Sequence, residues 1–218
     1  MNVLISYGSQ LAQGAGVTLA AWLVAGSMSI VVGTILGIFG SQKIGSNKLG
    51  ALIRAYTFVT KGIPAYVQIL IVYFVLPSLL GITISGFAAA GLALAFCSSG
   101  YVTEIVRAGI NAVPPGQWDA CFVLGYSQFQ TLRRIILPQT VRIVLPALLG
   151  ELEQLLKTTS LLATIGVTET TRVGMNIISR ELNPLPVYCA VACIYLIFSA
   201  LLNLVMFYAE RRMRYGSR

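Results

Sequence analysis

The stretch GIPAYVQILIVYFVLPSLLGITISGFAAAGLALAFCSSGYVT, residues 62–103, contains no charged side chain over 42 consecutive positions. An α-helix rises about 1.5 Å per residue, so roughly 20 apolar residues cross a hydrocarbon core about 30 Å thick. The run is therefore too long for one crossing and has to fold back. The segment LPSLLGITISG, residues 76–86, supplies a proline and two glycines at which the backbone can turn. The run and its flanks predict two transmembrane helices, 56–77 and 87–108.

The rest of the chain is also too apolar for a typical water-soluble domain. Only 10% of its 218 residues are charged, against roughly 25% in average globular proteins. Within the first remaining apolar run, Ser29, Gly33 and Gly37 recur every four residues and form a small-residue stripe for close helix packing. We therefore expect an all-α membrane protein with five transmembrane helices in a single domain, 1–218. The three further spans are predicted at 17–41, 143–165 and 186–209.

The composition argues against several classes of site. The chain has no histidine, and its four cysteines include no C-x-x-C pair, so no metal or haem site is expected. The net charge of +8 comes from basic residues scattered between apolar spans, which does not form a nucleic-acid-binding face. No paired catalytic constellation is found, so we expect no catalytic residue.

The basic residues also predict the orientation, because cytoplasmic loops of membrane proteins are enriched in lysine and arginine. With the N-terminus outside, eleven lysines and arginines face the cytoplasm, and only Arg172 and Arg180 lie clearly outside. We therefore expect the N-terminus outside and the C-terminus in the cytoplasm.

A polar, aromatic and basic segment, residues 114–138, separates the third and fourth spans and is cytoplasmic in this orientation. Its Asp119, Ala120 and Cys121 are followed after three intervening residues by Gly125, and after nine more intervening residues by Ile135, Leu137 and Pro138. This spacing resembles the EAA loop of ATP-binding cassette (ABC) importer permeases. The segment differs from the EAA motif at two positions: aspartate replaces the usual glutamate at 119, and cysteine replaces the second alanine at 121.

Other motifs extend this resemblance over nearly the whole chain. Together they resemble permeases of the polar amino acid uptake family, the membrane subunits of histidine-, arginine- and glutamine-type importers. The resemblance implies a type I ABC importer (MetI-like) permease fold, in a multi-pass protein of the bacterial inner membrane. The motifs are AVPPGQWDA at 112–120, KGIPAYVQILIVY at 61–73, YVTEIVRAGI at 101–110 and ELEQLLKTTSL at 151–161.

The same resemblance implies the partners. They are two ABC ATPase subunits, an identical or homologous permease subunit, an extracytoplasmic amino-acid-binding protein and a polar amino acid as substrate. The chain has no G-x-x-x-x-G-K-[ST] phosphate loop, so ATP and magnesium are expected on the partner ATPase. The chain would then be a permease subunit, not an enzyme, that binds no cofactor and couples ATP hydrolysis by its partner to alternating access.

The central segment has a pattern suited to contact with the ATPase. Trp118, Phe122, Tyr126 and Phe129 follow i, i+4, i+8 and i+11 spacing, which places an aromatic stripe on one side of a short helix. Gly125 costs about 1 kcal/mol in a helix interior and so predicts a bend or a close contact between short helices. The alternative is an amphipathic helix that lies on the lipid surface. The residues expected to couple to the ATPase are Gly116, Trp118, Asp119, Ala120, Phe122, Gly125, Tyr126, Leu137 and Pro138.

Charged residues inside predicted spans are candidates for the substrate pathway, because ionised groups in a bilayer usually face a partner or a wet cavity. Glu153 and Lys157 are four residues apart in the favourable order for a helix ion pair. Glu151 lies about 200° around the same helix and has no evident partner. In the family this glutamate opens a segment near the pathway, so we hypothesise that Glu151 meets the ammonium of an amino acid. The alternative is an interhelical hydrogen bond or salt bridge.

The remaining pathway candidates each have a structural alternative. Tyr66 and Gln68 follow a bend predicted at Pro64. They could line a cavity beside the broken helix, or the bend could be an ordinary kink without a pathway role. Thr158, Thr159 and Ser160 could line a pathway or bond only their own helix backbone. Glu104 could serve the pathway or pair with Arg107 at the surface, and Glu169 could form a gate, touch the binding protein or belong to a solvated turn.

Two other functions compete with the importer permease. One is a non-transport polytopic membrane scaffold, in which the EAA-like spacing would be chance. The other is a secondary transporter driven by an ion gradient, although no internal repeat of the kind common in such carriers is visible. The sequence leaves open which amino acid is carried, whether the permease pairs with itself or a relative, and how many substrate sites exist.

Overall fold

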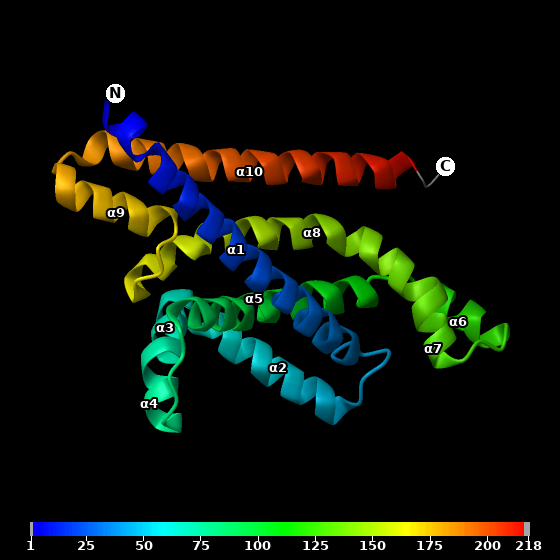
Figure 1. Ribbon diagram of the computed structural model, residues 1–218. Helices are drawn as coiled ribbons and strands as arrows, with labels where there is room; N and C mark the ends of the chain where they lie inside the picture. The colour runs from blue at the N-terminus through cyan, green and yellow to red at the C-terminus, as the bar shows by residue number, and fades with distance from the viewer. Residues whose placement is uncertain (1, 216–218) are drawn as a thin grey trace.

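The computed structural model describes residues 2–215, and every regular element in this range is helical (Figure 1). Residues 1 and 216–218 of the single domain expected over 1–218 lie outside the described residues. The α-helices are α1 (Asn2–Phe39), α2 (Asn47–Gly62), α3 (Ala65–Leu70), α4 (Leu76–Leu80), α5 (Gly86–Asn111), α6 (Pro115–Val123), α7 (Gln128–Thr131), α8 (Leu137–Thr158), α9 (Thr170–Glu181) and α10 (Pro184–Tyr215). Two π-helical segments, η1 (Ile71–Val75) and η2 (Leu132–Ile136), and a 3₁₀ segment, η3 (Thr159–Ile165), complete the chain.

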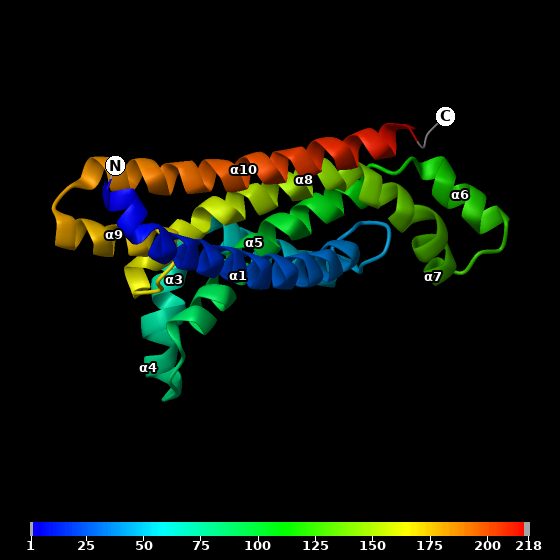
Figure 2. The ribbon, with the colours of Figure 1, turned by 45° about the horizontal axis from the view of Figure 1, so that its top comes forward.

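Four helical runs are long and apolar enough to cross a membrane: Ser6–Phe39, Gly86–Asn111, Gln128–Ile165 and Pro184–Arg211. A fifth span is present if the helices Asn47–Gly62 and Ala65–Leu80 count as one, although they are bent by 97° at their junction. The long helices run alongside one another, while α3 and α4 project from the side of the bundle (Figures 1 and 2). The expected helical membrane architecture is therefore present, and the segment predicted as the second span is sharply bent.

Close packing of α1 against α5 depends on the predicted small-residue stripe. A Cβ placed on Gly33 would lie 2.5 Å from Val102 Cβ, and one placed on Gly37 would lie 2.7 Å from Val106 Cβ. These separations are too short for any side chain, so both glycines let the two helix backbones approach closely. The predicted packing role of the stripe is confirmed.

The bend between α2 and α3 occurs at Pro64, as expected from a residue that lacks a backbone donor and restricts the residue before it. The α2 carbonyls left without helical partners are satisfied from the other side of the bend. Gln68 Nε2 donates to the carbonyls of Thr60 and Ile63, each at 2.7 Å. Gln68 is buried, so it stabilises the bend from inside the protein.

Pro77 and Pro138 do not end their helices, and after Pro77 the chain turns further on, within the segment 76–86 where a turn is predicted. Each proline follows a π-helical segment, η1 or η2, and the preceding leucine donates its N–H to the carbonyl five residues earlier. The wider π turn leaves space for the proline ring and needs no donor from it. Helix α4 thus continues to Leu80, and the turn comes at Gly81, which has a left-handed φ of 65°.

Candidate functional site

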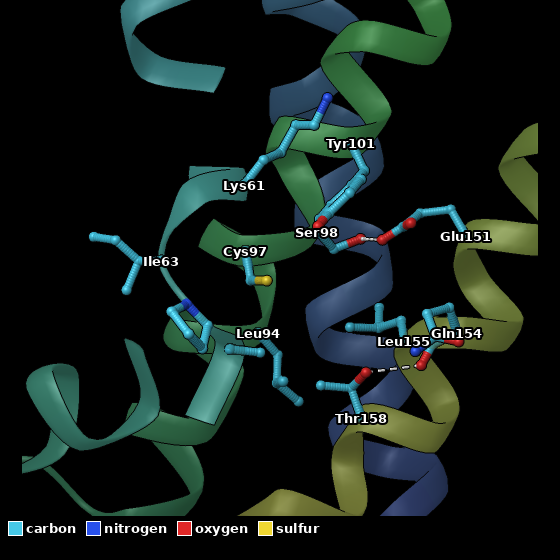
Figure 3. Close-up of a pocket in the computed structure, with 12 residues that line it drawn as sticks. Lys61, Ile63, Leu94, Cys97, Ser98, Tyr101, Glu151, Gln154, Leu155 and Thr158 are labelled. Carbon is cyan, nitrogen blue, oxygen red and sulfur yellow. Dashed lines mark hydrogen bonds between the residues drawn. The ribbon is translucent and has the colours of Figure 1, made fainter. Parts of the chain in front are cut away.

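A cavity of about 250 Å³ lies between the α2–α3 bend, α5 and α8 (Figure 3). The bend supplies one wall, and α5 and α8 supply the others. Its lining residues are Lys61, Ile63, Pro64, Ala65, Leu94, Cys97, Ser98, Tyr101, Glu151, Gln154, Leu155 and Thr158.

Two helices line the cavity with the same periodicity. The lining residues of α5 lie at positions 94, 97, 98 and 101, and those of α8 lie at 151, 154, 155 and 158. Both sets follow i, i+3, i+4 and i+7, the spacing of one helix face. Sequence analysis selected Glu151 and Thr158 from these faces. The signal it missed is that each face carries further polar groups among apolar ones: Ser98 and Tyr101 on α5, and Gln154 on α8.

Glu151 is the single acidic group that lines this cavity. It is half-buried, and Ser98 Oγ on α5 donates to its Oε1 at 2.7 Å (Figure 3). No ion pair of Glu151 is found in the described part of the chain. By contrast, Lys157 Nζ lies 2.7 Å from Glu153 Oε1, so the predicted pair one helix face away is confirmed. The hydrogen bond to Ser98 is the interhelical contact that sequence analysis kept as an alternative role for Glu151, and the cavity leaves room for a ligand beside it.

Lys61 supplies the positive charge at the same cavity. It belongs to the last turn of α2, just before the bend, and its Nζ lies 5.5 Å from the centre of the Tyr101 ring. A lysine ammonium over an aromatic face at this distance forms a cation–π contact. The cavity therefore joins a carboxylate on α8 with an ammonium on α2.

The other predicted pathway residues do not line this cavity. Gln68 stabilises the bend, as described above, and Tyr66 is exposed on α3. Thr159 Oγ1 donates to the carbonyl of Leu156, and Ser160 Oγ donates to that of Lys157, so both hydroxyls bond their own helix.

Glu104 is held between α5 and α2, away from the cavity lining. It pairs with Arg107, and Thr57 Oγ1 donates to its Oε1 at 3.0 Å. The half-buried pair with Arg107 agrees with the alternative that its sequence spacing suggested, and the contact with Thr57 adds a link between the two helices.

Glu169 is fully buried at the start of α9, so its interpretation as part of a solvated turn is wrong. Its carboxylate accepts the N–H groups of Thr171 at 2.8 Å and Arg172 at 2.7 Å, and the Tyr195 hydroxyl donates to it at 2.8 Å. Burial raises the pKa of Glu169 above its ordinary value, against the effect of these donors. The residue caps α9 and joins it to α10.

The central segment folds as two short helices separated by a tight turn. Gly125 has a φ of 74° and donates to the carbonyl of Phe122, while Tyr126 donates to that of Cys121. These two bonds form a Schellman motif, which ends α6. Ser127 and Gln130 then form a capping box that begins α7. The predicted bend at Gly125 is confirmed.

The aromatic stripe expected on one helix is divided by this turn, and this part of the expectation is wrong. Trp118 packs inward against the cluster around Val106 and Ile110, whereas Phe122 is 84% exposed and Phe129 is 68% exposed. Val123 and Leu124 beside them are 83% and 71% exposed. The exposed apolar group of Phe122, Val123, Leu124 and Phe129 is called the α6–α7 tip below.

The other coupling candidates surround this tip. Gly116, Asp119, Ala120, Gly125 and Pro138 are exposed, and Tyr126 and Leu137 are half-buried. Figures 1 and 2 show α6 and α7 at one end of the molecule and α9 at the other.

The described residues contain no group of three or more cysteine, aspartate or glutamate side chains able to hold a metal ion. Of the residues predicted to act, Glu151 lines the charged cavity and Phe122 belongs to the α6–α7 tip.

Comparison with known proteins identifies relatives over nearly the full length. Residues 29–215 match the model of the family described as "Binding-protein-dependent transport system inner membrane component". The chain is 32% identical to the glutamine transport system permease protein GlnP of Escherichia coli strain K12, over 94% of this chain and 93% of that protein.

Solved structures give a consistent result. A crystal structure of an amino acid ABC transporter with histidines contains a chain that is 30% identical, with a TM-score of 0.87 and 96% of each chain covered. The inward-facing MetNI methionine ABC transporter has a TM-score of 0.82 at 19% identity, over 95% of this chain and 98% of that one, and so supports the fold alone.

Proposed function

Because this chain belongs to the family of binding-protein-dependent transport system inner membrane components, the permease subunits of ABC importers, we propose that it carries a polar amino acid into the cytoplasm. Family membership argues against the scaffold and ion-gradient alternatives. The energy would come from ATP hydrolysis on a partner, because this chain has no phosphate loop. ATP and magnesium would bind that partner, and no cofactor would bind this chain.

The observation that carries this proposal is that one helical run bears both candidate regions. The run Gln128–Ile165 begins with Phe129 of the α6–α7 tip and continues to Glu151 in the cavity. At about 1.5 Å per residue, these two residues are separated by roughly 33 Å of helix. Movement of the tip by a partner would therefore be transmitted along α8 to one wall of the cavity.

The α6–α7 tip is the proposed docking site for the ATPase. Its apolar side chains are exposed in the isolated chain, and burying them in a groove of a partner would remove that area from water. The division of the aromatic stripe suits this role. Trp118 fixes α6 to the body of the permease while Phe122 and Phe129 remain available to the partner.

The cavity is the proposed substrate site. Glu151 faces it from a membrane-spanning helix and has no ion-pair partner in the described residues. We assign to it the ammonium of the transported amino acid, since an ionised carboxylate in a span is stabilised by an opposite charge.

The complete importer is proposed to contain two ABC ATPase subunits, a second permease subunit identical or homologous to this one, and an extracytoplasmic amino-acid-binding protein. The N-terminus would face the outside and the C-terminus the cytoplasm of a bacterial inner membrane. The excess of lysine and arginine on the proposed cytoplasmic side supports this orientation.

Substitution at Ala120 tests the proposal. Ala120 is exposed on α6, so Ala120→Leu leaves the permease itself undisturbed but overfills a seated ATPase interface. In proteoliposomes with the ATPase and binding protein, we expect uptake of labelled amino acid to fall about tenfold or more. Ala12→Leu is the matched control, because Ala12 is exposed on α1 near the N-terminus, at the end opposite α6 and α7 (Figure 1).

The readout is ATP-dependent uptake of radiolabelled glutamine, arginine and glutamate, with insertion measured by recovery of the permease in the vesicles. Equal uptake by the Ala120 and Ala12 variants would contradict the docking role. Absence of ATP-dependent uptake of all three substrates by the unmodified complex would contradict transport of polar amino acids itself.

A further inference from the structure

The cavity carries one charge of each sign among its twelve lining residues. Lys61 approaches from the end of α2 and Glu151 from α8, with α5 between them (Figure 3). Every other lining residue is uncharged. The net charge of the lining is therefore zero, but it is divided between two walls.

Both charges are available to a ligand. No ion pair of Lys61 or Glu151 is found within the part of the chain that the structure describes, and Glu151 accepts a neutral hydroxyl donor from Ser98. The neighbouring charges are already balanced by partners of their own. Glu153 pairs with Lys157, and Glu104, which also attracts Lys61, pairs with Arg107.

The size of the cavity suits one small molecule. Its volume of about 250 Å³ accommodates a single amino acid. The remaining wall groups are mostly apolar, with Gln154 and Thr158 as neutral polar groups on the α8 side.

From this arrangement we infer that the cavity selects α-amino acids with an uncharged side chain, with Lys61 binding the carboxylate and Glu151 the ammonium. The inference rests on the proposed transport function and adds the substrate class. A zwitterion neutralises both wall charges at once. A cationic or anionic side chain would add a third charge without a partner among the lining residues, which is unfavourable within a membrane span.

Charge-removal variants test this assignment directly. The purified complex of permease and ATPase, without the binding protein, is equilibrated with radiolabelled glutamine, arginine or glutamate, so that only the permease cavity discriminates. We expect the unmodified complex to bind glutamine at least about tenfold more tightly than either charged amino acid. This factor corresponds to a cost of about 1.4 kcal/mol for the unpaired third charge.

Each variant should shift the preference in a defined direction. Lys61→Gln leaves one carboxylate in the cavity, so arginine should gain relative to glutamine by on the order of tenfold. Glu151→Gln leaves one ammonium, so glutamate should gain by a similar factor. The matched controls are Lys157→Gln and Glu153→Gln. Each removes a charge of the same sign as its cavity counterpart, but from a position on α8 that does not line the cavity. Both should leave the order of affinities for glutamine, arginine and glutamate unchanged.

The outcomes separate this inference from the proposed function. ATP-dependent uptake by the complete importer is measured on the same preparations, and basal ATP hydrolysis confirms that each variant is assembled. If uptake is intact but the cavity variants keep the wild-type order of affinities, the substrate assignment is wrong and the transport function stands. A wild-type preference for arginine or glutamate would also overturn the assignment. Loss of uptake in the unmodified complex would remove the proposed function itself.

Discussion

The substitution Gly100→Ala tests whether the wall between α2 and α5 is as tight as the structure requires. A Cβ on Gly100 would lie 2.0 Å from Thr60 Oγ1 and 2.9 Å from Thr60 Cβ. Rotation of the Thr60 side chain about χ1 moves Oγ1 but leaves Cβ in place, so the added methyl group still pushes the two helices apart. Thr60 adjoins Lys61 and Gly100 adjoins Tyr101, so the displaced helices are those that form the cavity.

The expected magnitude follows from two opposing effects. Forcing an additional methyl group into a packed interface costs about 1–3 kcal/mol, whereas alanine is favoured over glycine in a helix by about 1 kcal/mol. Gly150→Ala shows the gain in helix propensity alone, because Gly150 lies in α8 and a Cβ there meets nothing within 4 Å. The propensity gain is common to both variants, so Gly100→Ala should be less stable than Gly150→Ala by about 1–3 kcal/mol.

Thermal unfolding of the purified permease in detergent measures this difference. For a chain of this size, about 1 kcal/mol corresponds to roughly 2–4 °C in Tm. Adding Thr60→Ala to Gly100→Ala removes the closest atom and should recover most of the loss, measured against Thr60→Ala alone in a double-mutant cycle. The reasoning is refuted if Gly100→Ala is as stable as Gly150→Ala, or if Thr60→Ala does not rescue it.

Two further predictions concern the ends of the molecule. Gly125→Ala should lower the free energy of unfolding by about 1–2 kcal/mol, because Gly125 has a left-handed φ of 74° and no atom obstructs a Cβ there. Gly125→Asn should retain more of the stability, because asparagine tolerates a left-handed φ better than alanine. Equal Tm values for the two variants would contradict a backbone origin of the loss. Because the pKa of Glu169 is raised, the folded state binds the carboxyl proton more tightly than the unfolded state does. The stability gained from this protonation is complete at pH below the ordinary pKa of 4.5 and declines as the pH rises through the folded pKa. Glu169→Gln removes this titrating group and should flatten the Tm-versus-pH curve at pH above 4.5. An unchanged slope would show that Glu169 does not cause the pH dependence.

The membrane class and the course of the chain were predictable because they depend on local composition. A charge-free run of 42 residues is too long for one crossing wherever its partners lie, and Pro64 bends the chain through its own ring and missing donor. The small-residue stripe at Gly33 and Gly37 was equally readable, because its spacing alone places both residues on one helix face.

The site was predictable only in part. Glu151 stood out because an ionised group in a span is costly, but Tyr66, Gln68, Thr159, Ser160, Glu104 and Glu169 carried similar signals and do not line the cavity. Polar groups in a membrane protein also cap helices, bond their own backbone and join neighbouring helices, and residue type does not distinguish these uses. Lys61 was placed near a bend without a role, since nothing in its local sequence indicates that it shares a cavity with Glu151.

The sequence by itself determined which segments are apolar enough for a membrane, how many such runs there are and where the backbone bends. Each of these properties depends on the composition of a short stretch of chain. Tertiary structure alone decided that Lys61 and Glu151, far apart in the chain, line one cavity, and that Trp118 turns inward while Phe122 and Phe129 stay exposed. The reason is geometric. Which face of a helix meets a neighbour depends on the size of the bend, 97°, on the π turns before Pro77 and Pro138 and on the close approach of α1 to α5, and these are settled only when all the helices pack together.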